Sequence, residues 1–287
     1  MQIRDEHLDA RNSLAVTLPP WLESLRSREI LEKVRSDPRS TAGKFLGVSR
    51  SIALDTVIGR GQADFDSSWE HLTPNDRVLL YAYFNQRGHL EELVEAFRQL
   101  FPDGSPPNNP IIVDLGCGPC TGGLAFAGMC KEIRQFDYIG VDQSEAMRDL
   151  GEGLASAAPQ LGRSQRQWAS TLPAVAWNDA PSWRPVVVIV SYLLASPTLD
   201  TADRLIRNLD RLLTKIGRGR ATVIYTNSSN ITPNRRFPEF RDTLFYHGFS
   251  LFADDTGTIP VERLGETVPR NLRYALFDRP ERRILEL

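Results

Sequence analysis

Two aspartates and two glycines stand where they could shape a ligand-binding site. The apolar residues 111–113 lead into Asp114, and the chain then turns at Gly116 and Gly118. Glycine lets the backbone turn sharply and approach a ligand without a side chain in the way. Amide groups at the start of a following helix carry partial positive charge toward such a ligand. A second acidic residue, Asp142, ends another apolar run.

The stretch Asp114-Leu115-Gly116-Cys117-Gly118 resembles the first motif of the class I S-adenosylmethionine-dependent methyltransferase family. That motif is an acidic residue followed by spaced glycines, although the third glycine that often follows is Cys120 here. The resemblance extends to Asp142, because the family places an acid at the end of the next strand to accept both ribose hydroxyls of the cofactor. A carboxylate suits that role, since its two oxygens can accept hydrogen bonds from two neighbouring hydroxyls.

The resemblance implies S-adenosyl-L-methionine as the cofactor and a methyltransferase activity on an acceptor that is a small molecule, a protein or an RNA. The four histidines are scattered and form no metal-binding cluster with cysteine and aspartate in the sequence, so we expect no metal. In the family, residues after the fourth strand face the methyl group, so we expect Ser191 and Tyr192 to be catalytic. Tyr192, Tyr83 or His89 could act as a base. The residues expected to bind the cofactor are Asp114, Gly116, Cys117, Gly118, Asp142, Gln143, Met147, Trp168 and Tyr83.

Three other interpretations remain open. A dinucleotide-binding loop would need a third glycine at position 121, where the chain has Thr121, but it would use Asp142 in the same way. The letters Cys117-Gly118-Pro119-Cys120 match a thioredoxin-like redox motif, yet the nearby Asp114 would oppose formation of the thiolate. A non-catalytic subunit that keeps the fold, and with it the cofactor site, is the third.

The composition is that of an ordinary globular protein, with 41% hydrophobic and 24% charged residues. A formal net charge of -2 does not indicate nucleic acid as a partner, although a local basic patch stays open. Three cysteines in 287 residues favour a reducing compartment. The polar N-terminus and the lack of a long apolar run predict a cytoplasmic protein without membrane contact. The oligomeric state is not encoded in any of these features.

The pattern of apolar residues predicts an N-terminal helical cap over residues 1–109 and a methyltransferase domain over residues 110–287. In the cap we expect a helix that begins after Thr73-Pro74 and a second one after Gly88. In the domain we expect alternating strands and helices. The last two strands, near residues 249–252 and 272–277, are expected to be separated by a long loop.

The expected fold class is therefore α/β. It is a Rossmann-like, mostly parallel seven-stranded sheet with helices on both faces, preceded by the helical extension.

Overall fold

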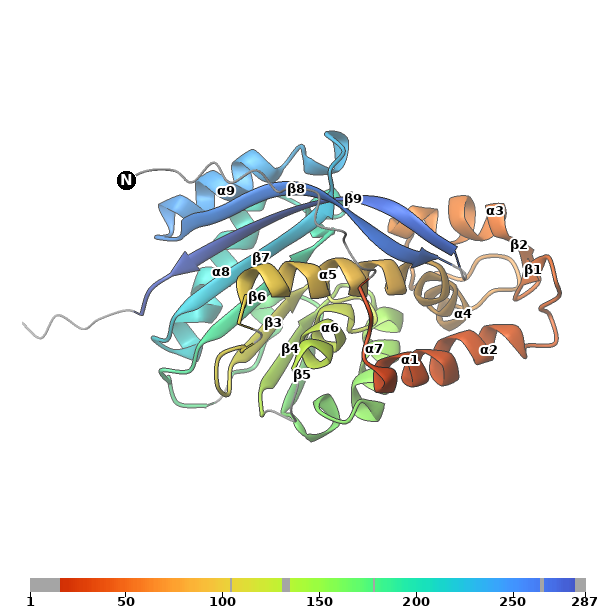
Figure 1. Cartoon of the computed structure of the whole chain (residues 1–287), viewed down its shortest axis with the longest axis horizontal. Helices are drawn as coiled ribbons and strands as arrows, with labels where there is room; N and C mark the ends of the chain where they lie inside the picture. The colour runs from red at the N-terminus through yellow and green to blue at the C-terminus, as the bar shows by residue number, and fades with distance from the viewer. Residues whose placement is uncertain (1–15, 104, 131–134, 178, 264–265, 282–287) are drawn as a thin grey trace, which may run out of the picture.

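The computed structural model describes residues 16–103, 105–130, 135–177, 179–263 and 266–281. Its centre is a seven-stranded sheet in the order β5-β4-β3-β6-β7-β9-β8 (Figure 1). Neighbouring strands pair in parallel except around β9, which is antiparallel to both β7 and β8. The sheet confirms the expected Rossmann-like, mostly parallel fold.

The strands form where the sequence carries apolar runs, because both faces of the sheet are covered. Every residue of β3 and β4 is buried, and so is every residue of β6 except the last. The strands of the sheet are β3 (Ile111–Leu115), β4 (Asp137–Val141), β5 (Arg166–Ala169), β6 (Val186–Ser191), β7 (Ala221–Ser228), β8 (Ser250–Arg263) and β9 (Glu266–Arg279).

Helices cover both faces of this sheet. One face carries α5 (Arg87–Leu100), α6 (Thr121–Met129) and α7 (Glu145–Ala157), together with the cap. The other carries α8 (Ala202–Ile216) and α9 (Phe237–Tyr246). The short helical turns of this part are η5 (Leu161–Arg163), η6 (Leu172–Ala174), η7 (Leu193–Ala195) and η8 (Thr232–Asn234).

The cap packs into the same hydrophobic core as α6 and α7, so the division at residue 109 stays a prediction. Its elements are α1 (Pro20–Arg26), η1 (Ser27–Leu31), α2 (Glu32–Arg35), β1 (Lys44–Phe45), β2 (Val48–Ser49), α3 (Arg50–Ile52), η2 (Ala53–Val57), η3 (Gly59–Gly61), α4 (Pro74–Tyr81) and η4 (Ala82–Gln86).

The last cap helix corrects one expectation, because the helix does not break at Gly88. Helix α4 begins as predicted, with Thr73 and Asp76 forming a capping box. The wide π-helical turn η4 then joins α4 directly to α5, so the chain stays helical past Gly88. The glycine serves a different purpose, since a Cβ there would lie 2.7 Å from Arg270 Nη1 of strand β9.

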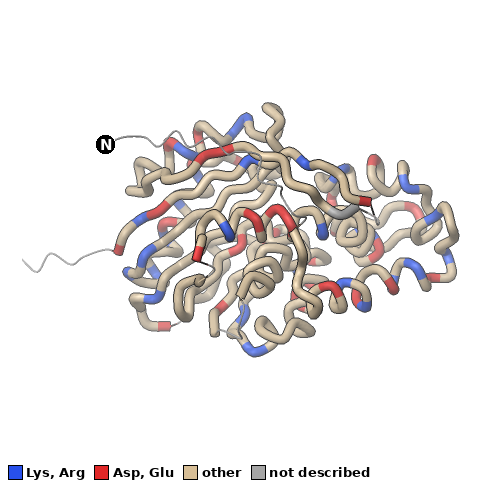
Figure 2. The backbone as a smooth tube through the Cα atoms, in the orientation of Figure 1, with Lys and Arg blue, Asp and Glu red and all other residues tan. Residues whose placement is uncertain are grey.

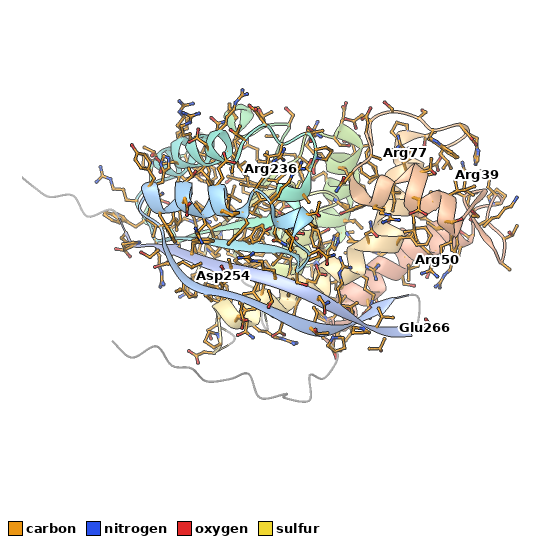
Figure 3. The ribbon with its side chains drawn as sticks, turned by 90° about the horizontal axis from the view of Figure 1, so that it is seen from above. Arg39, Arg50, Arg77, Arg236, Asp254 and Glu266 are labelled. Atoms are coloured by element: carbon orange, nitrogen blue, oxygen red, sulfur yellow. The ribbon has the colours of Figure 1, made fainter. Side chains whose placement is uncertain are left out.

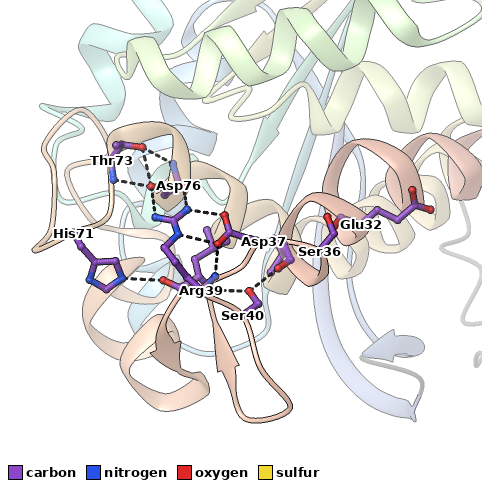
Figure 4. A network of polar contacts seen from close by, with 10 residues as sticks. Glu32, Ser36, Asp37, Arg39, Ser40, His71, Thr73 and Asp76 are labelled. Atoms are coloured by element: carbon purple, nitrogen blue, oxygen red, sulfur yellow. Dashed lines mark hydrogen bonds and ion pairs between the residues drawn. The ribbon is translucent and has the colours of Figure 1, made fainter.

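A single arginine fixes the start of this helix to the rest of the cap (Figure 4). Arg39 donates to both carboxylate oxygens of Asp37 and to both of Asp76. Ser40 Oγ accepts the Leu46 amide, which ties the small β1–β2 hairpin to the same network. These contacts hold the beginning of α4 where the capping box needs it.

The last two strands form one long hairpin, which corrects the expected loop between them. β8 and β9 pair from Ser250–Asp278 as far as Arg263–Glu266, well beyond the part of β9 that pairs with β7. In the view of Figure 3 the hairpin runs from Asp254 to Glu266, and its Glu266 end lies beside the cap helix that carries Arg50. There Ile259, Val261 and Leu272 form a small hydrophobic core that belongs to the hairpin.

Acidic and basic residues are interspersed along the backbone in the view of Figure 2, without a face of one sign. No helix in the described part of the chain is both long enough and apolar enough to cross a lipid bilayer.

Candidate functional site

The carboxyl ends of β3, β4 and β6 meet at one edge of the sheet and position the site. The strand order reverses between β3 and β6, and ligands of open parallel sheets bind at such a reversal. The Gly116 and Cys117 amides both donate to the Val141 carbonyl oxygen, which fixes the turn after β3 to the end of β4. The motif turn and Asp142 therefore lie together.

The turn after β3 adopts the backbone that its glycines permit. Gly116 and Gly118 have φ of +69° and +50°, in the left-handed region that favours glycine. A Cβ on Gly116 would lie 3.2 Å from Leu193 Cδ1, in the loop after β6. Cys120 also has a positive φ, +61°, where it begins α6. The turn thus brings its backbone close to the end of β6 without a third glycine.

Asp142 presents its carboxylate to this turn. Its Oδ2 accepts the Gly118 amide at 2.9 Å, and its Oδ1 accepts the Ser144 amide at 3.0 Å. Each oxygen keeps a second lone pair, so each can also accept a hydroxyl group. Burial raises the pKa of Asp142, although both amides and Arg148 oppose that rise. The residue lies where the resemblance places the acceptor of the ribose hydroxyls.

Asp114 lies inside the fold, and its expected contact with the cofactor stays a prediction. Its side chain is 2% exposed, and its Oδ2 accepts the Tyr138 hydroxyl at 2.9 Å. The amides of Gly123 and Gly122 also donate to it. Burial raises the pKa of Asp114 to about 7. Asp114 therefore holds the first turn of α6 beneath the motif.

The two motif cysteines do not suit a redox role. Cys117 and Cys120 are buried and carry free thiols. Burial raises the pKa of both thiols, and the neighbouring Asp114 adds to that rise. A redox-active cysteine of this kind needs an exposed sulfur with a lowered pKa. Cys117 contributes its backbone to the turn, and its side chain belongs to the core.

An aromatic side chain of the cap borders the turn, and it is Tyr81 rather than the expected Tyr83. A Cβ on Gly118 would lie 4.0 Å from Tyr81 Cε1 and equally far from Met147 Sδ. Tyr83 points into the cap, where its ring centroid lies 5.3 Å from that of Phe45. Residues two apart in a helix face different directions. Tyr81 and the expected Met147 thus border the crevice, whereas Tyr83 does not.

The aromatic border continues from Tyr81 through His89 to Tyr192. The Tyr81 hydroxyl lies 3.4 Å from His89 Nδ1, and the His89 ring stacks on that of Tyr192 with centroids 4.4 Å apart. Burial, helped by Arg270, lowers the pKa of His89 well below its usual value. Burial and Glu92 raise the pKa of Tyr192. At pH 7 the imidazole is therefore neutral and the phenol keeps its proton.

The expected catalytic pair lies at the end of β6, as predicted. Ser191 is half-buried, and its Oγ accepts the Thr226 hydroxyl at 2.9 Å. Tyr192 has a φ of +58°, in the left-handed region of backbone conformation. Its ring forms part of the aromatic border, but its hydroxyl points to Glu92 at 3.1 Å. A catalytic role for either residue stays a prediction.

A buried ion pair stands behind this border. Arg270 reaches from β9 to the fully buried Glu92 of α5 and donates to it from Nε. Arg270 Nη2 also donates to the Tyr192 hydroxyl at 2.9 Å. Burial raises the pKa of Glu92 to about 7, although Arg270 opposes the rise. Together with Tyr192, the pair joins three segments that are far apart in the sequence.

A cavity of about 620 Å³ borders this ion pair, a size typical of small-molecule sites. It lies between the cap, the loop after β7 and the hairpin. Its polar lining consists of Asp55, Arg60, Asn85, Asn230 and Arg270, with Gly88 beside them.

A loop of the cap, residues 57–67, closes over the motif side of the crevice. Asp66 accepts hydrogen bonds from Ser144 Oγ and from the Glu145 and Ala146 amides, at the start of α7. The buried Arg77 holds the loop by donating to the carbonyl oxygens of Val57, Asp64 and Ser67. The loop is therefore fixed both to the cap and to the helix that follows Asp142.

The remaining expected residues lie further out. Gln143 is exposed, and its Nε2 donates to Thr198 Oγ1 at 2.8 Å, across the crevice. Trp168 packs so closely that a Cβ on Gly140 would lie 2.6 Å from its ring, and its Nε1 donates to Glu152 of α7. The indole is thus held in the packing of α7, and its role at the adenine stays a prediction.

No group of three or more His, Cys, Asp or Glu side chains in the described residues is placed to hold a metal ion.

A family described as mitochondrial small ribosomal subunit Rsm22 matches residues 79–254, which is more than half of the chain. The chain is a member of the Rsm22 family. The match covers the motif turn, Asp142, Glu92 and Tyr192, and it ends before Arg270. No curated protein sequence matches this Rsm22-family chain significantly.

Solved structures similar to the Rsm22-family chain share little sequence with it. One is an S-adenosylmethionine-dependent methyltransferase of Methanosarcina mazei, 12% identical over 64% of this chain and 98% of its own, with a TM-score of 0.42. Another is magnesium protoporphyrin IX methyltransferase of Synechocystis with bound SAH, 15% identical over 79% and 96%, with a TM-score of 0.41. A third is TYW2 of M. jannaschii with AdoMet, 14% identical over 66% and 76%, with a TM-score of 0.37.

Sequence reasoning missed Asp66, Glu92 and Arg270. Glu92 had a signal, because it follows Leu90 and precedes Leu93 on a helix whose apolar face is buried. A carboxylate beside such a face needs a partner. Asp66 and Arg270 carried no such signal in the sequence, since their partners are supplied by segments far away in the chain.

Proposed function

We propose that this Rsm22-family chain is an S-adenosylmethionine-dependent methyltransferase. The observation that carries the proposal is the half-buried carboxylate of Asp142, which accepts the Gly118 amide at the point where the strand order reverses. Its free lone pairs fit two ribose hydroxyls, and the turn at Gly116 leaves the backbone open to a ligand. The cofactor fits these residues.

When bound, the cofactor supplies a methyl group attached to a positively charged sulfur. Asp142 would hold its ribose, and the loop that carries Asp66 would cover it. The rings of Tyr81, His89 and Tyr192 border the crevice on the side of β6 and would exclude water there. Aromatic faces attract cations within about 6 Å, which suits a sulfonium.

Calorimetry with S-adenosylmethionine and S-adenosylhomocysteine tests this proposal. Asp142→Asn keeps the shape of the side chain but removes its charge and one acceptor, so we expect binding to weaken about 100-fold. Asp149→Ala, on the exposed face of α7, is the matched control and should bind as the parent does. Absence of binding by both ligands, with tight binding of a nicotinamide dinucleotide instead, would overturn it.

A second candidate function is a non-catalytic subunit that keeps the cofactor site. The description of the family favours it, since that description names the mitochondrial small ribosomal subunit. We therefore take small ribosomal subunits as the first acceptor and partner to test. Binding of the cofactor and of the subunits without transfer of a labelled methyl group would support the second function. The cytoplasmic location stays a prediction.

A further inference from the structure

The cavity beside Arg270 lies outside the residues that hold the cofactor. Its walls come from the cap, the start of α5, the loop after β7 and the end of the long hairpin, and its Arg270 contacts Tyr192 of the crevice. Tyr192 directly follows β6, and the family resemblance places the residues after that strand beside the methyl group. An acceptor in the cavity would therefore approach that group from the side of β6.

The hydrogen bonds of Arg270 leave one edge of its guanidinium unused. Nε donates to Glu92, and Nη2 donates to Tyr192. Nη1 has no hydrogen-bond partner within the described residues, and it lies so close to Gly88 that a Cβ there would come within 2.7 Å of it. A guanidinium has five donors in a fixed plane, which suits the paired oxygens of a carboxylate or phosphate.

The other polar groups of the cavity also favour an acceptor of negative charge. Asn85 and Asn230 line it with side-chain amides that make no hydrogen bond in the described structure. The carboxylate of Asp55 lies there too, but it accepts from Arg60 at 3.0 Å, so this pair adds no net charge. Arg270 is paired in turn with Glu92, which stands behind it and is fully buried, so what Arg270 offers the cavity is the unused donors of Nη1.

We propose that this cavity binds an oxyanion of the methyl acceptor, a carboxylate or a phosphate, through Nη1 of Arg270 with Asn85 and Asn230 as neutral donors. Leu54 and Phe84 provide apolar surface for the body of the acceptor. The inference rests on the proposed function only in naming the bound molecule as the methyl acceptor. Binding of an anion does not require the cofactor.

Calorimetric titration of the full chain with inorganic phosphate, and separately with citrate, tests the site at low salt. Gly88→Ala is the sharpest variant, because its Cβ would fall 2.7 Å from Nη1 and so displace that donor while the charge remains. Glu92→Gln combined with Arg270→Gln removes both charges and so leaves no buried ion without a partner. Arg211→Gln, an exposed arginine on α8, is the matched control.

We expect saturable binding of at least one anion, weakened tenfold or more in Gly88→Ala and in the double variant and unchanged in Arg211→Gln. Stronger binding of phosphate assigns a phosphate-bearing acceptor, and stronger binding of citrate assigns a carboxylate-bearing one. Thermal unfolding checks the fold of each variant. If the double variant does not fold, the result for Gly88→Ala decides the test.

The proposal is overturned if neither anion binds the parent saturably, or if Gly88→Ala binds as tightly as the parent. Titration with S-adenosylhomocysteine on the same samples separates this outcome from failure of the proposed function. Anion binding without cofactor binding would leave the cavity site standing and remove the methyltransferase. Cofactor binding without anion binding would remove the cavity site and leave the methyltransferase standing.

Discussion

The cofactor half of the site, formed by the turn at Gly116 and Gly118 with Asp142, is built largely from backbone. Its residues lie within 27 positions of one another and its contacts are amides on carbonyl and carboxylate oxygens. The cavity half, formed around Glu92, Tyr192 and Arg270, is built from side chains. Its side chains come from a helix, a strand end and a hairpin that are far apart in the chain.

This difference indicates how each half responds to change. A site made of backbone fails when a side chain is added, because a Cβ has no space to occupy. A site made of buried charges fails when a charge is removed or titrated, because its partner then lacks compensation. The two halves should therefore be separable by experiment.

The largest effect is expected from Gly122→Ala in the cofactor half. Its Cβ would lie 2.6 Å from Asp114 Oδ2, inside the closely packed start of α6. We expect the free energy of unfolding to fall by about 3 kcal/mol in urea denaturation. Gly153→Ala in α7, whose Cβ would meet nothing within 4 Å, should instead raise it by about 0.5 kcal/mol. Equal changes in the free energy of unfolding of the two variants would contradict the view that the cofactor half is built from backbone.

The cavity half should respond to pH through Glu92. Burial raises its pKa from 4.5 to about 7, so the folded chain holds this proton more tightly than the unfolded chain does. Its contribution to stability is complete below pH 4.5 and is lost as the pH rises through about 7.

Glu92→Gln removes that titration. We expect the stability of the variant relative to the parent to improve by about 3 kcal/mol between pH 4.5 and 8, measured by urea denaturation at each pH. The control is Glu95→Gln, one turn further along α5 and paired with Arg98 at the surface. A constant difference between Glu92→Gln and the parent at all pH values would contradict the prediction.

The smallest effect tests the loop that joins the cap to the cofactor half. Asp66→Ala removes its three hydrogen bonds to the start of α7. We expect S-adenosylhomocysteine to dissociate about tenfold faster in stopped-flow experiments, which corresponds to about 1.4 kcal/mol. Asp64→Ala, whose side chain bonds Asp66 and Ser67 within the same loop, should change the rate less. Identical rates in the parent and Asp66→Ala would show that the loop does not retain the ligand.

The sequence was informative where a signal is local. The helix expected at Thr73-Pro74 agrees with the structure, because capping involves neighbours only. Gly88 was misread for the opposite reason. It signals a helix end to local reasoning, but its small size serves Arg270, which lies 182 positions away. The prediction named Tyr83 where the structure has Tyr81, because the side of a helix that faces the sheet is set by contacts with segments far away in the chain.

The wide turn η4 has a consequence for insertions and deletions. In a regular α-helix, side chains eight positions apart point about 80° away from each other. One extra residue in a π-helical turn reduces that angle to about 20°, which aligns Tyr81 with His89. Loss of a single residue between 82 and 86 would turn the π-helical turn into a regular one and leave the residues after it in the same phase, whereas loss of a residue from the regular turns of α4 would rotate them by about 100° relative to the start of that helix. A deletion therefore keeps the helix in phase at η4 but not in the regular turns on either side of it.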